Sequence, residues 1–316
     1  MNERVVALSG GVGGAKLVDG LSRALPPDAL TVIVNTGDDF EHLGLAISPD
    51  IDSVVYALAG LSDPVRGWGR RDETWNFMAA LSQLGGPDWF RIGDADLAMH
   101  VERSARLSRG ESLSAVTARI CAALGVGARV LPMSDDRVRT RLRTDEGWLE
   151  FQEYFVGRQC RPRVSEIAYE GASSARAQPD VLDALREQGL RAVVICPSNP
   201  FLSVEPILAI PELRAALQNA GAPVVAVTPI VGGQAIKGPA AKMMRELGIE
   251  VASASVAARY AGLVDVFVAD SSDPQPDPIA GMRIVRTQSV MRTEEDRRAL
   301  AESVLAFADA ARGASG

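Results

Sequence analysis

Short runs of apolar, mostly β-branched residues alternate with amphipathic segments toward both ends of the chain. Runs of this kind, nearly free of polar residues, are typical of strands buried on both faces of a parallel sheet. They are Val5–Leu8, Leu30–Val34, Ala192–Cys196, Val224–Val227 and Val264–Ala269. The helical patterns between them are Ile51–Ala59, Pro179–Gln188, Pro211–Asn219 and Ala240–Leu247. This alternation predicts an α/β fold, a Rossmann-like parallel sheet with helices on both faces.

The middle of the chain has a different pattern. It contains three amphipathic helical stretches: Glu73–Leu84, Leu97–Leu107 and Ser112–Leu124. A β-hairpin is expected after them, with strands at Arg137–Arg143 and Trp148–Phe155. We therefore expect residues 1–61 and 166–316 to form the Rossmann-like core. Residues 62–165 would form a mainly helical insertion with a β-hairpin that supplies a substrate wall. A last helix, Thr293–Ala311, is expected to be capped by Thr293.

Composition narrows the class of protein. The 316 residues carry a net charge of −7, and no run rich in Lys or Arg is present, which argues against a nucleic-acid surface. No apolar stretch is long enough to span a bilayer, and no secretory leader is evident. The three cysteines, Cys121, Cys160 and Cys196, fit no metal-ligand spacing. These features predict a cytoplasmic protein with no nucleic-acid or membrane partner.

A glycine-rich segment, Ser9–Lys16, directly follows the first predicted strand. Four glycines, Gly10, Gly11, Gly13 and Gly14, precede a helix expected from Ala15 to Leu25. Such a turn directs backbone N–H groups and the helix dipole at one point, which suits a phosphate group, and Lys16 adds a positive charge. A simple tight turn is the alternative. The segment is neither a dinucleotide fingerprint nor a P-loop, because Lys16 replaces the third glycine and Ala15 precedes the lysine.

Carboxylates gather after the second predicted strand. The segment Asn35–Asp39 holds Thr36, Gly37, Asp38 and Asp39, and the segment Ser48–Asp52 adds Asp50 and Asp52. One or two of these aspartates are explained as helix caps. The others favour a cation between the carboxylates and a phosphate, and oxygen ligands suit Mg²⁺. We therefore expect at least one of Asp38, Asp39 and Asp50 to bind magnesium.

Four further segments have the composition of binding loops, although each has a structural alternative. Ser198, Asn199 and Ser203 follow the strand ending at Cys196 and offer hydrogen bonds to a base or ribose. Gly232, Gly233 and Lys237 stand in a second glycine-rich loop, after Val227. Trp75 is either a core residue or a ring that stacks on a planar heterocycle. In the segment Gly93–His100, Asp94 or Asp96 is expected to cap a helix, and His100 is either a helix histidine or a site residue.

In this order and spacing, the segments resemble the 2-phospho-L-lactate transferase family (CofD/FbiA type), which acts in biosynthesis of the deazaflavin coenzyme factor 420. The resemblance covers about residues 4 to 270. The segments that carry it are Leu8–Lys16, Asn35–Asp39, Ser48–Asp52, Gly67–Trp75, Gly93–His100, Pro197–Leu208 and Pro229–Lys237.

The resemblance implies an activity. A guanosine diphosphate-linked donor carries a three-carbon acid on its distal phosphate, and the terminal ribityl hydroxyl of the deazaflavin precursor Fo attacks that phosphorus. GMP leaves, a phosphodiester forms, and Mg²⁺ is the expected cofactor. The family uses phospholactate, phosphoenolpyruvate or phosphoglycerate, and no residue of this chain discriminates between these acids. A homodimer is also implied.

The resemblance further implies roles for individual residues. Asp38 and Asp50 would be the metal ligands, and Asp39 would orient or deprotonate the attacking hydroxyl. The binding set is expected to comprise Gly10, Gly11, Gly13, Gly14, Lys16, Thr36, Gly37, Trp75, Asp94, His100, Ser198, Asn199, Ser203, Gly232, Gly233 and Lys237. Within it, the two glycine-rich loops would hold the diphosphate, the Ser198–Ser203 loop the guanosine and Trp75 the deazaflavin. The alternative is that the two positions are exchanged, with the deazaflavin at the Ser198–Ser203 loop and the guanosine at Trp75.

Two other functions compete with this one. A sister branch of the superfamily, the gluconeogenesis-factor-like proteins, binds a nucleotide sugar and has a regulatory role. Those proteins follow the aspartates with a Gly-Gly-Ser-Ser run, where this chain has Phe40–Gly44 instead. A nicotinamide-dependent oxidoreductase, with Asp38 on a ribose, is the third alternative. Lys16 in the fingerprint position argues against it.

Overall fold

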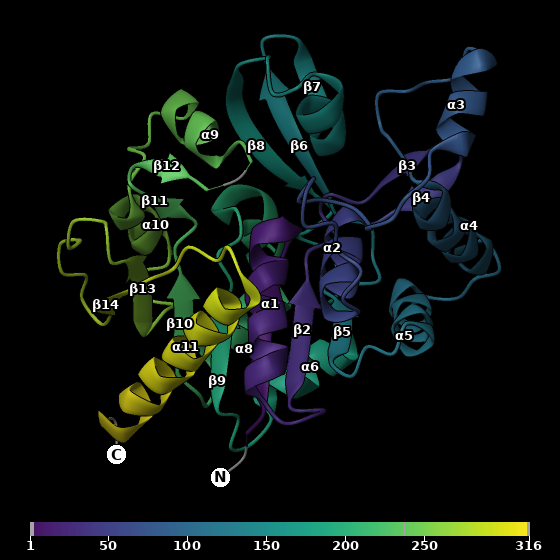
Figure 1. Ribbon diagram of the computed structural model, residues 1–316. Coiled ribbons are helices and arrows are strands. Elements are labelled where there is room, and N and C mark those ends of the chain that lie inside the picture. The colour runs from purple at the N-terminus through teal and green to yellow at the C-terminus, as the bar shows by residue number, and fades with distance from the viewer. Residues whose placement is uncertain (1–2, 237, 315–316) are drawn as a thin grey trace.

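A seven-stranded parallel sheet forms the centre of the computed structural model, which describes residues 3–236 and 238–314 (Figure 1). All of its neighbouring strands pair in parallel. From one edge to the other the strands are β14 (Arg283–Thr287), β13 (Val266–Asp270), β10 (Val224–Val227), β9 (Ala192–Ile195), β1 (Val5–Ser9), β2 (Leu30–Val34) and β5 (Arg129–Pro132). The prediction of an α/β fold with a parallel sheet is confirmed, and all five predicted strands are present.

Helices cover both faces of this sheet, as predicted. In β1, Val5 and Ala7 belong to one apolar core and Val6 and Leu8 to the other, because successive side chains of a strand point to opposite faces. The helices on the first face are α1 (Gly11–Ala24), α2 (Pro49–Leu58), α5 (Leu113–Ala123) and α11 (Glu294–Ala314). Those on the second face are α6 (Pro179–Arg186), α7 (Glu205–Leu208), α8 (Pro211–Gln218), α9 (Ala240–Glu246) and α10 (Ser253–Arg259).

The order of the strands reverses between β1 and β9. From β1 the chain builds outward through β2 to β5, then returns to place β9 on the other side of β1 and continues outward through β10, β13 and β14. In open parallel sheets, ligands bind beyond the carboxyl ends of the strands at such a reversal. The segments that follow β1 and β9 are therefore the place to look for a site.

Smaller elements stand above this carboxyl edge and beside it (Figure 1). The predicted hairpin is confirmed as β6 (Arg139–Thr144) and β7 (Gly147–Glu150), joined by β8 (Val164–Glu170) into a three-stranded antiparallel sheet. The others are β3 (Phe40–His42), β4 (Leu45–Ile47), α3 (Asn76–Gln83), α4 (Asp94–Leu107), β11 (Ile230–Val231), β12 (Gln234–Ala235) and two π-helical turns, η1 (Glu153–Gly157) and η2 (Pro200–Val204).

Two strands of the main sheet were not expected. β5 lies inside the range assigned to the insertion, and β14 follows the last predicted strand. Both are edge strands with exposed arginines, Arg129 and Arg283, so neither has the continuous apolar pattern of a strand buried on both faces. The division into a core and an insertion at residues 62–165 stays a prediction. Within that range, β5 belongs to the main sheet.

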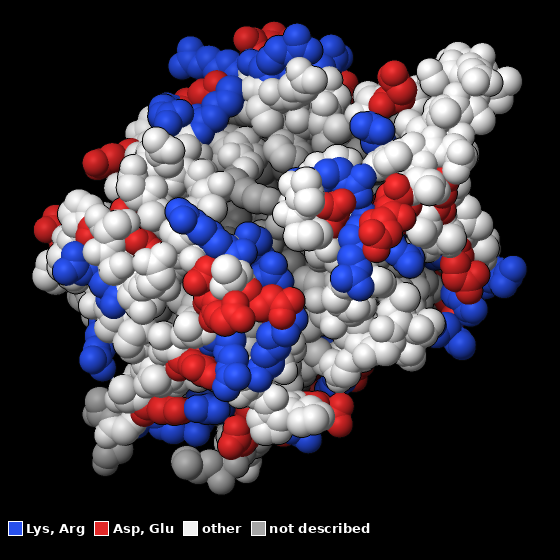
Figure 2. Space-filling model, viewed as in Figure 1, with Lys and Arg blue, Asp and Glu red and all other residues white. Residues whose placement is uncertain are grey.

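The surface carries charges of both signs. Figure 2 shows basic and acidic side chains interspersed over the visible face, which is hollowed in its upper half. Among the described residues, no helix is both long and apolar enough to cross a membrane.

Candidate functional site

The segments after β1 and β9 are joined directly, at the point where the strand order reverses. The Gly10 amide donates to Ser198 Oγ at 3.1 Å, and Ser198 Oγ donates to the Gly10 carbonyl at 2.8 Å. A Cβ on Gly13 would lie 2.8 Å from the Pro197 carbonyl oxygen, so a side chain there would push the two segments apart. Close approach of the β9 segment is thus one reason for the glycines.

The glycine-rich segment is the first turn of α1 and not a loop before it. The helix begins at Gly11, four residues earlier than predicted, and Gly11 enters it with φ +62°, which favours glycine. Its amide donates to Asp50 Oδ1 at 2.6 Å. Lys16 Nζ donates to the Met291 carbonyl at 2.9 Å. The amides of Gly10 and Gly11, which we expected to face a phosphate, therefore have acceptors within the protein.

Asn35 joins two of the predicted catalytic aspartates. Its Nδ2 lies 2.7 Å from Asp38 Oδ1 and 2.9 Å from Asp50 Oδ2, and it also donates to the Leu202 carbonyl at 3.1 Å. Its Oδ1 accepts from the Gly37 amide at 2.8 Å, which fixes the orientation of the amide. The structure thus brings Asp38 and Asp50 together at the start of α1, as the sequence analysis expected.

The electrostatics of this pair favour a bound cation. Both side chains are buried, and burial together with the charge of Asp50 raises the pKa of Asp38 well above its ordinary value. Burial likewise raises the pKa of Asp50 to about 6, although hydrogen bonds from Asn35 and Gly11 oppose the rise. Two such carboxylates are unfavourable together unless a proton or a cation compensates their charge.

Asp39 is the third buried carboxylate of this edge. Its Oδ2 accepts from Ser48 Oγ at 2.8 Å, while its Oδ1 is buried without a hydrogen-bond partner in the structure. Burial raises its pKa to about 7, against the opposing charge of Arg139. A carboxylate with a pKa near neutrality and one unused oxygen has the properties of a group that accepts a hydrogen bond or a proton from a substrate.

A second buried cluster lies between α2 and α4. Asp52, Asp96 and His100 each place one ligand atom within 4.8 Å of the others, a spacing that would admit a metal ion. Arg103, however, is buried beside them and forms an ion pair with Asp52, and its Nη1 lies 3.2 Å from His100 Nδ1. The guanidinium already supplies the positive charge there. His100 Nδ1 lies 3.7 Å from Asp52 Oδ2 and its Nε2 lies 3.3 Å from Asp96 Oδ2, so the ring contacts α2 from α4. A role of His100 in the site stays a prediction.

The loop after β9 uses its polar groups mostly on itself. Asn199 Oδ1 accepts from the amides of Phe201 and Leu202 and so caps η2, while its Nδ2 is buried without a partner. Ser203 is buried, and its Cβ would lie 2.5 Å from a Cβ on Gly10. The loop expected to bind guanosine thus lies against the glycine turn. In the segment after β2, Thr36 Oγ1 is also buried without a hydrogen-bond partner.

The second glycine-rich segment forms a hairpin rather than a loop that leads into a helix. Gly232 and Gly233 have φ of +60° and +68° and form the turn between β11 and β12, a conformation typical of two-residue hairpins. The Gly232 amide donates to Asp273 Oδ1 at 2.6 Å. Lys237, the third residue expected to bind there, lies outside the described residues.

Trp75 and Asp94 stand at the starts of α3 and α4. The Trp75 ring has the guanidinium carbons of Arg66 and Arg91 at 5.0 and 4.2 Å from its centroid. Asp94 caps α3 and not its own helix, because its carboxylate accepts from the Asn76 and Phe77 amides at 3.0 and 2.9 Å. A hydrogen bond from the Thr74 hydroxyl, followed by those from Phe77 and Asn76, lowers the pKa of Asp94 to about 2.

The cap expected from Asp94 or Asp96 is supplied by another residue. Glu73 accepts from the Ala95 and Asp96 amides of α4 at 2.9 and 2.8 Å. Each of α3 and α4 is therefore capped by an acid next to the start of the other. A Cβ on Gly93 would collide with Glu73, which explains the glycine at this position.

Sequence reasoning gave no role to four residues that shape the site: Asn35, Ser48, Arg103 and Arg139. Asn35 is the first residue after β2, so its place at a carboxyl end was a usable signal. Ser48 precedes Asp50 within a segment already singled out. The carboxylates that Arg103 and Arg139 act on, Asp52 and Asp39, lie far away in the sequence, and nothing local indicates them.

Buried carboxylates and a glycine-rich helix start at a strand reversal define a class, the α/β enzymes that carry their site at the carboxyl edge of a parallel sheet. Comparison with known proteins identifies the family within this class. The profile of the 2-phospho-L-lactate transferase CofD matches residues 5–308. The chain belongs to this transferase family.

Named relatives agree with the family match. A phosphoenolpyruvate transferase of Kitasatospora aureofaciens is 41% identical over 322 residues, which cover 99% of this chain and 100% of that protein. A 2-phospho-L-lactate transferase of Methanosarcina mazei is 38% identical over 305 residues, covering 95% and 99%. Among solved structures, a UPF0052-family protein of Bacillus halodurans aligns with a TM-score of 0.62 and 16% identity, covering 96% of this chain and 99% of that one. This last likeness shows the fold alone.

Proposed function

We propose that this chain transfers a phosphorylated three-carbon acid from a guanosine diphosphate-linked donor to the terminal ribityl hydroxyl of the deazaflavin precursor Fo, with release of GMP. Family membership supports the reaction type, and relatives carry the names phosphoenolpyruvate transferase and 2-phospho-L-lactate transferase. The observation that carries the proposal is the pair Asp38 and Asp50. The side-chain amide of Asn35 holds both carboxylates near the start of α1.

The residues at this edge fit a magnesium ion. Asp38 and Asp50 supply hard oxygen donors, and their charges are uncompensated by any ion pair among the described residues. Bound there, Mg²⁺ would neutralise charge on the diphosphate and on the departing GMP. The cluster of Asp52, Asp96 and His100 is the less suitable site, because Arg103 occupies it.

The chain's own groups would position the two substrates. Asn35 keeps Asp38 and Asp50 in place, and the start of α1 directs its dipole toward the same point. The amides of Gly13 and Gly14 would face the donor's phosphates, and Lys16 would join them by exchanging the Met291 carbonyl for a phosphate oxygen. Phosphoryl transfer depends mostly on such positioning and on charge neutralisation.

Asp39 would act on the attacking hydroxyl. Ser48 fixes one of its oxygens, and the other is buried without a partner, so a substrate O–H is the missing donor. Accepting this hydrogen bond orients the hydroxyl oxygen for attack on phosphorus, and the same carboxylate takes the proton as the new bond forms.

The test is mass spectrometry of a reaction that contains the purified protein, Mg²⁺, Fo and one of three guanosine diphosphate-linked acids, phospholactate, phosphoenolpyruvate or phosphoglycerate. We expect an Fo phosphodiester that appears with an equal amount of GMP, and the preferred acid identifies the donor. Absence of product with every donor, together with tight binding of a nucleotide sugar, would replace the proposal by the regulatory function of the sister branch. Analytical ultracentrifugation of the same sample tests the homodimer, which stays a prediction.

A further inference from the structure

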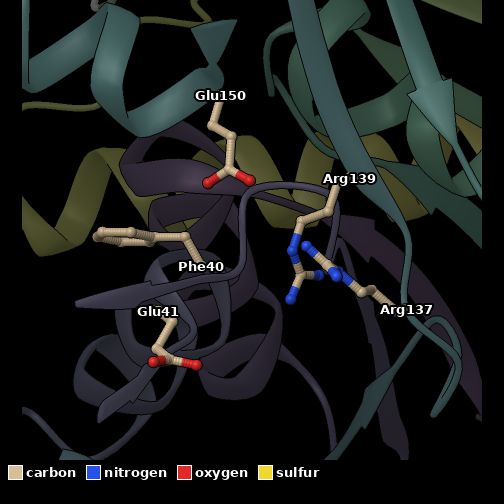
Figure 3. Close-up of a pocket in the computed structure, with 5 residues that line it drawn as sticks. All are labelled: Phe40, Glu41, Arg137, Arg139 and Glu150. Atoms are coloured by element: carbon tan, nitrogen blue, oxygen red, sulfur yellow. The ribbon is translucent and has the colours of Figure 1, made fainter. Parts of the chain in front are cut away.

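A cavity of about 320 Å³ opens next to Phe40, the residue that follows Asp39 in the chain (Figure 3). It is lined by Phe40, Glu41, Arg137, Arg139 and Glu150, which come from β3, β7 and the start of β6. Figure 3 shows the guanidinium groups of Arg137 and Arg139 extending into it from one wall, with Glu150 on another. None of these five residues has a role in the site as described so far, apart from the charge of Arg139 near Asp39.

A backbone hydrogen bond connects the wall of the cavity to the segment that carries Asp38 and Asp39. The Thr140 amide donates to the Gly37 carbonyl at 2.8 Å, and a Cβ on Gly37 would lie 2.6 Å from Thr140 Oγ1. The start of β6 is therefore packed on the segment that carries Asp38 and Asp39. Arg139 directly precedes Thr140, and its charge lowers the pKa that burial raises at Asp39.

In the part of the chain that the structure describes, Arg137 and Arg139 lack the carboxylate partners that the next two arginines of β6 have. Farther along β6, Arg141 pairs with Glu170 and Arg143 pairs with Glu166, each at 3.4 Å. Among the described residues, no carboxylate forms an ion pair with Arg137 or Arg139, and Arg139 Nη1 donates to the Val138 carbonyl at 2.7 Å. Burial lowers the pKa of Arg139, and the charge of Arg137 lowers it further, while the charges of Asp39 and Glu150 offset this lowering only in part. Two cations held together in this way indicate that an anion binds between them.

We propose that Arg137 and Arg139 bind the carboxylate of the donor's three-carbon acid and so determine which nucleotides serve as donors. This inference rests on the proposed function. Phosphoenolpyruvate and 2-phospho-L-lactate both carry a carboxylate on the carbon that bears the phosphoester oxygen. The carboxylate is thus only a few bonds from phosphorus, and its pocket must adjoin the phosphoryl site, as this cavity does. The planar fork of a guanidinium matches a carboxylate in bidentate geometry.

The experiment compares donor, acceptor and nucleotide affinities in R139Q, R137Q and the wild type. For each arginine variant we expect the KM of the guanosine diphosphate-linked acid to rise about tenfold to a hundredfold, since a hydrogen-bonded charge is lost. The KM of Fo and the calorimetric Kd of GDP, which has no carboxylate, should stay within about twofold. R139K, which keeps the charge but loses the fork, should fall between R139Q and the wild type.

The matched control is R143Q, because Arg143 lies on the same strand but is exposed and paired with Glu166. It should leave all three constants unchanged. An unchanged donor KM in both R137Q and R139Q would overturn the inference. An equal loss of GDP affinity would assign the arginines to the phosphates, and a rise confined to the KM of Fo would assign the cavity to the acceptor. An inactive wild type would instead refute the proposed function, and circular dichroism of each variant identifies misfolding.

Discussion

The side-chain amide of Asn35, just after β2, donates at 2.9 Å to Oδ2 of Asp50, which lies fifteen positions further along in α2. The same nitrogen also holds Asp38. One neutral amide thus keeps two buried carboxylates close to each other without supplying a positive charge. This arrangement lowers the stability of the fold when no cation is bound. Because the two carboxylates do not stabilise the fold, their presence is explained by function.

Asp38→Asn tests this cost. Removing one of two adjacent buried charges relieves repulsion and desolvation, so we expect the metal-free protein to gain on the order of 1 kcal/mol in free energy of unfolding. Magnesium-dependent turnover should disappear, and so should any rise in the melting temperature on adding Mg²⁺. Urea unfolding with and without Mg²⁺, beside the activity assay, checks all three effects. Near-normal turnover would remove Asp38 from the metal site.

Gly10→Ala tests the close approach of the segments after β1 and β9. The new methyl group would collide with Asp50 Oδ2 and lie 2.5 Å from Ser203 Cβ. We expect a loss of about 1–3 kcal/mol in stability and a larger loss of activity, because Asp50 must move. Gly127→Ala is the control, since nothing lies within 4 Å of its Cβ position. Thermal unfolding and turnover of both variants decide the matter, and a stable, active Gly10→Ala protein would contradict the packing described.

Arg103→Leu tests the buried ion pair between α4 and α2. It leaves Asp52 without a counter-charge, and we expect a loss of about 3–5 kcal/mol in the free energy of unfolding. Replacing Asp52 by Leu in the same chain should recover much of that loss, because no unpaired charge remains. Arg298→Gln, at an exposed helix pair with Glu302, should change stability by less than about 0.5 kcal/mol. A small effect of Arg103→Leu would reopen this cluster as a metal site.

Asp94→Asn tests the cap on α3 through its pH dependence. The pKa of Asp94 is about 2 in the folded protein, below the value of about 3.9 for an unfolded chain, so its ionised form stabilises the fold. This stabilisation is fully present above the unfolded pKa and is lost as the pH falls through the folded pKa. The wild type should therefore exceed Asp94→Asn in stability by a constant amount from pH 7 to about pH 5. The difference should shrink as the pH falls further and vanish below about pH 2, as followed by urea unfolding at each pH.

Trp75→Leu tests the expected contact with the deazaflavin. If the Trp75 ring stacks on the heterocycle, the affinity for Fo falls about tenfold and the affinity for GDP does not change. Trp68→Leu is the matched control, because Arg66 also lies over the Trp68 ring and Trp68 is 47% exposed. Fluorescence titration of Fo and calorimetry of GDP give the two affinities. An equal loss of both would make Trp75 a structural residue.

Much of the architecture was predictable because strands buried on both faces have a strong pattern. The bounds of β2 and β10 agree with their predictions, and β6 and β7 form a hairpin in the region predicted for it. Asp38 was expected beside the glycine turn because carboxyl ends of neighbouring parallel strands meet at one edge, and the structure joins it to Asp50 through Asn35, while the metal role of both stays a prediction. Edge strands such as β14 escaped prediction, since one half-exposed side permits arginine.

The tertiary partners of individual residues were not predictable. The glycines of the first turn suit a phosphate and a close approach of protein equally well, and only the structure shows the amides of Gly10 and Gly11 bound to Ser198 and Asp50. Asp94 lies at a helix start, where capping its own helix is the simplest expectation, yet its carboxylate caps α3.

The paired hydrogen bonds of Gly10 and Ser198 span 188 positions of the chain. During synthesis, the glycine turn, Asn35 and all three aspartates leave the ribosome long before β9, which must then insert beside β1. Contacts of such separation form late, because a long loop has to close first. A chain that ends between residues 51 and 197 consequently contains every aspartate of the site but lacks Ser198 and Leu202, which bind Gly10 and Asn35 in the complete chain.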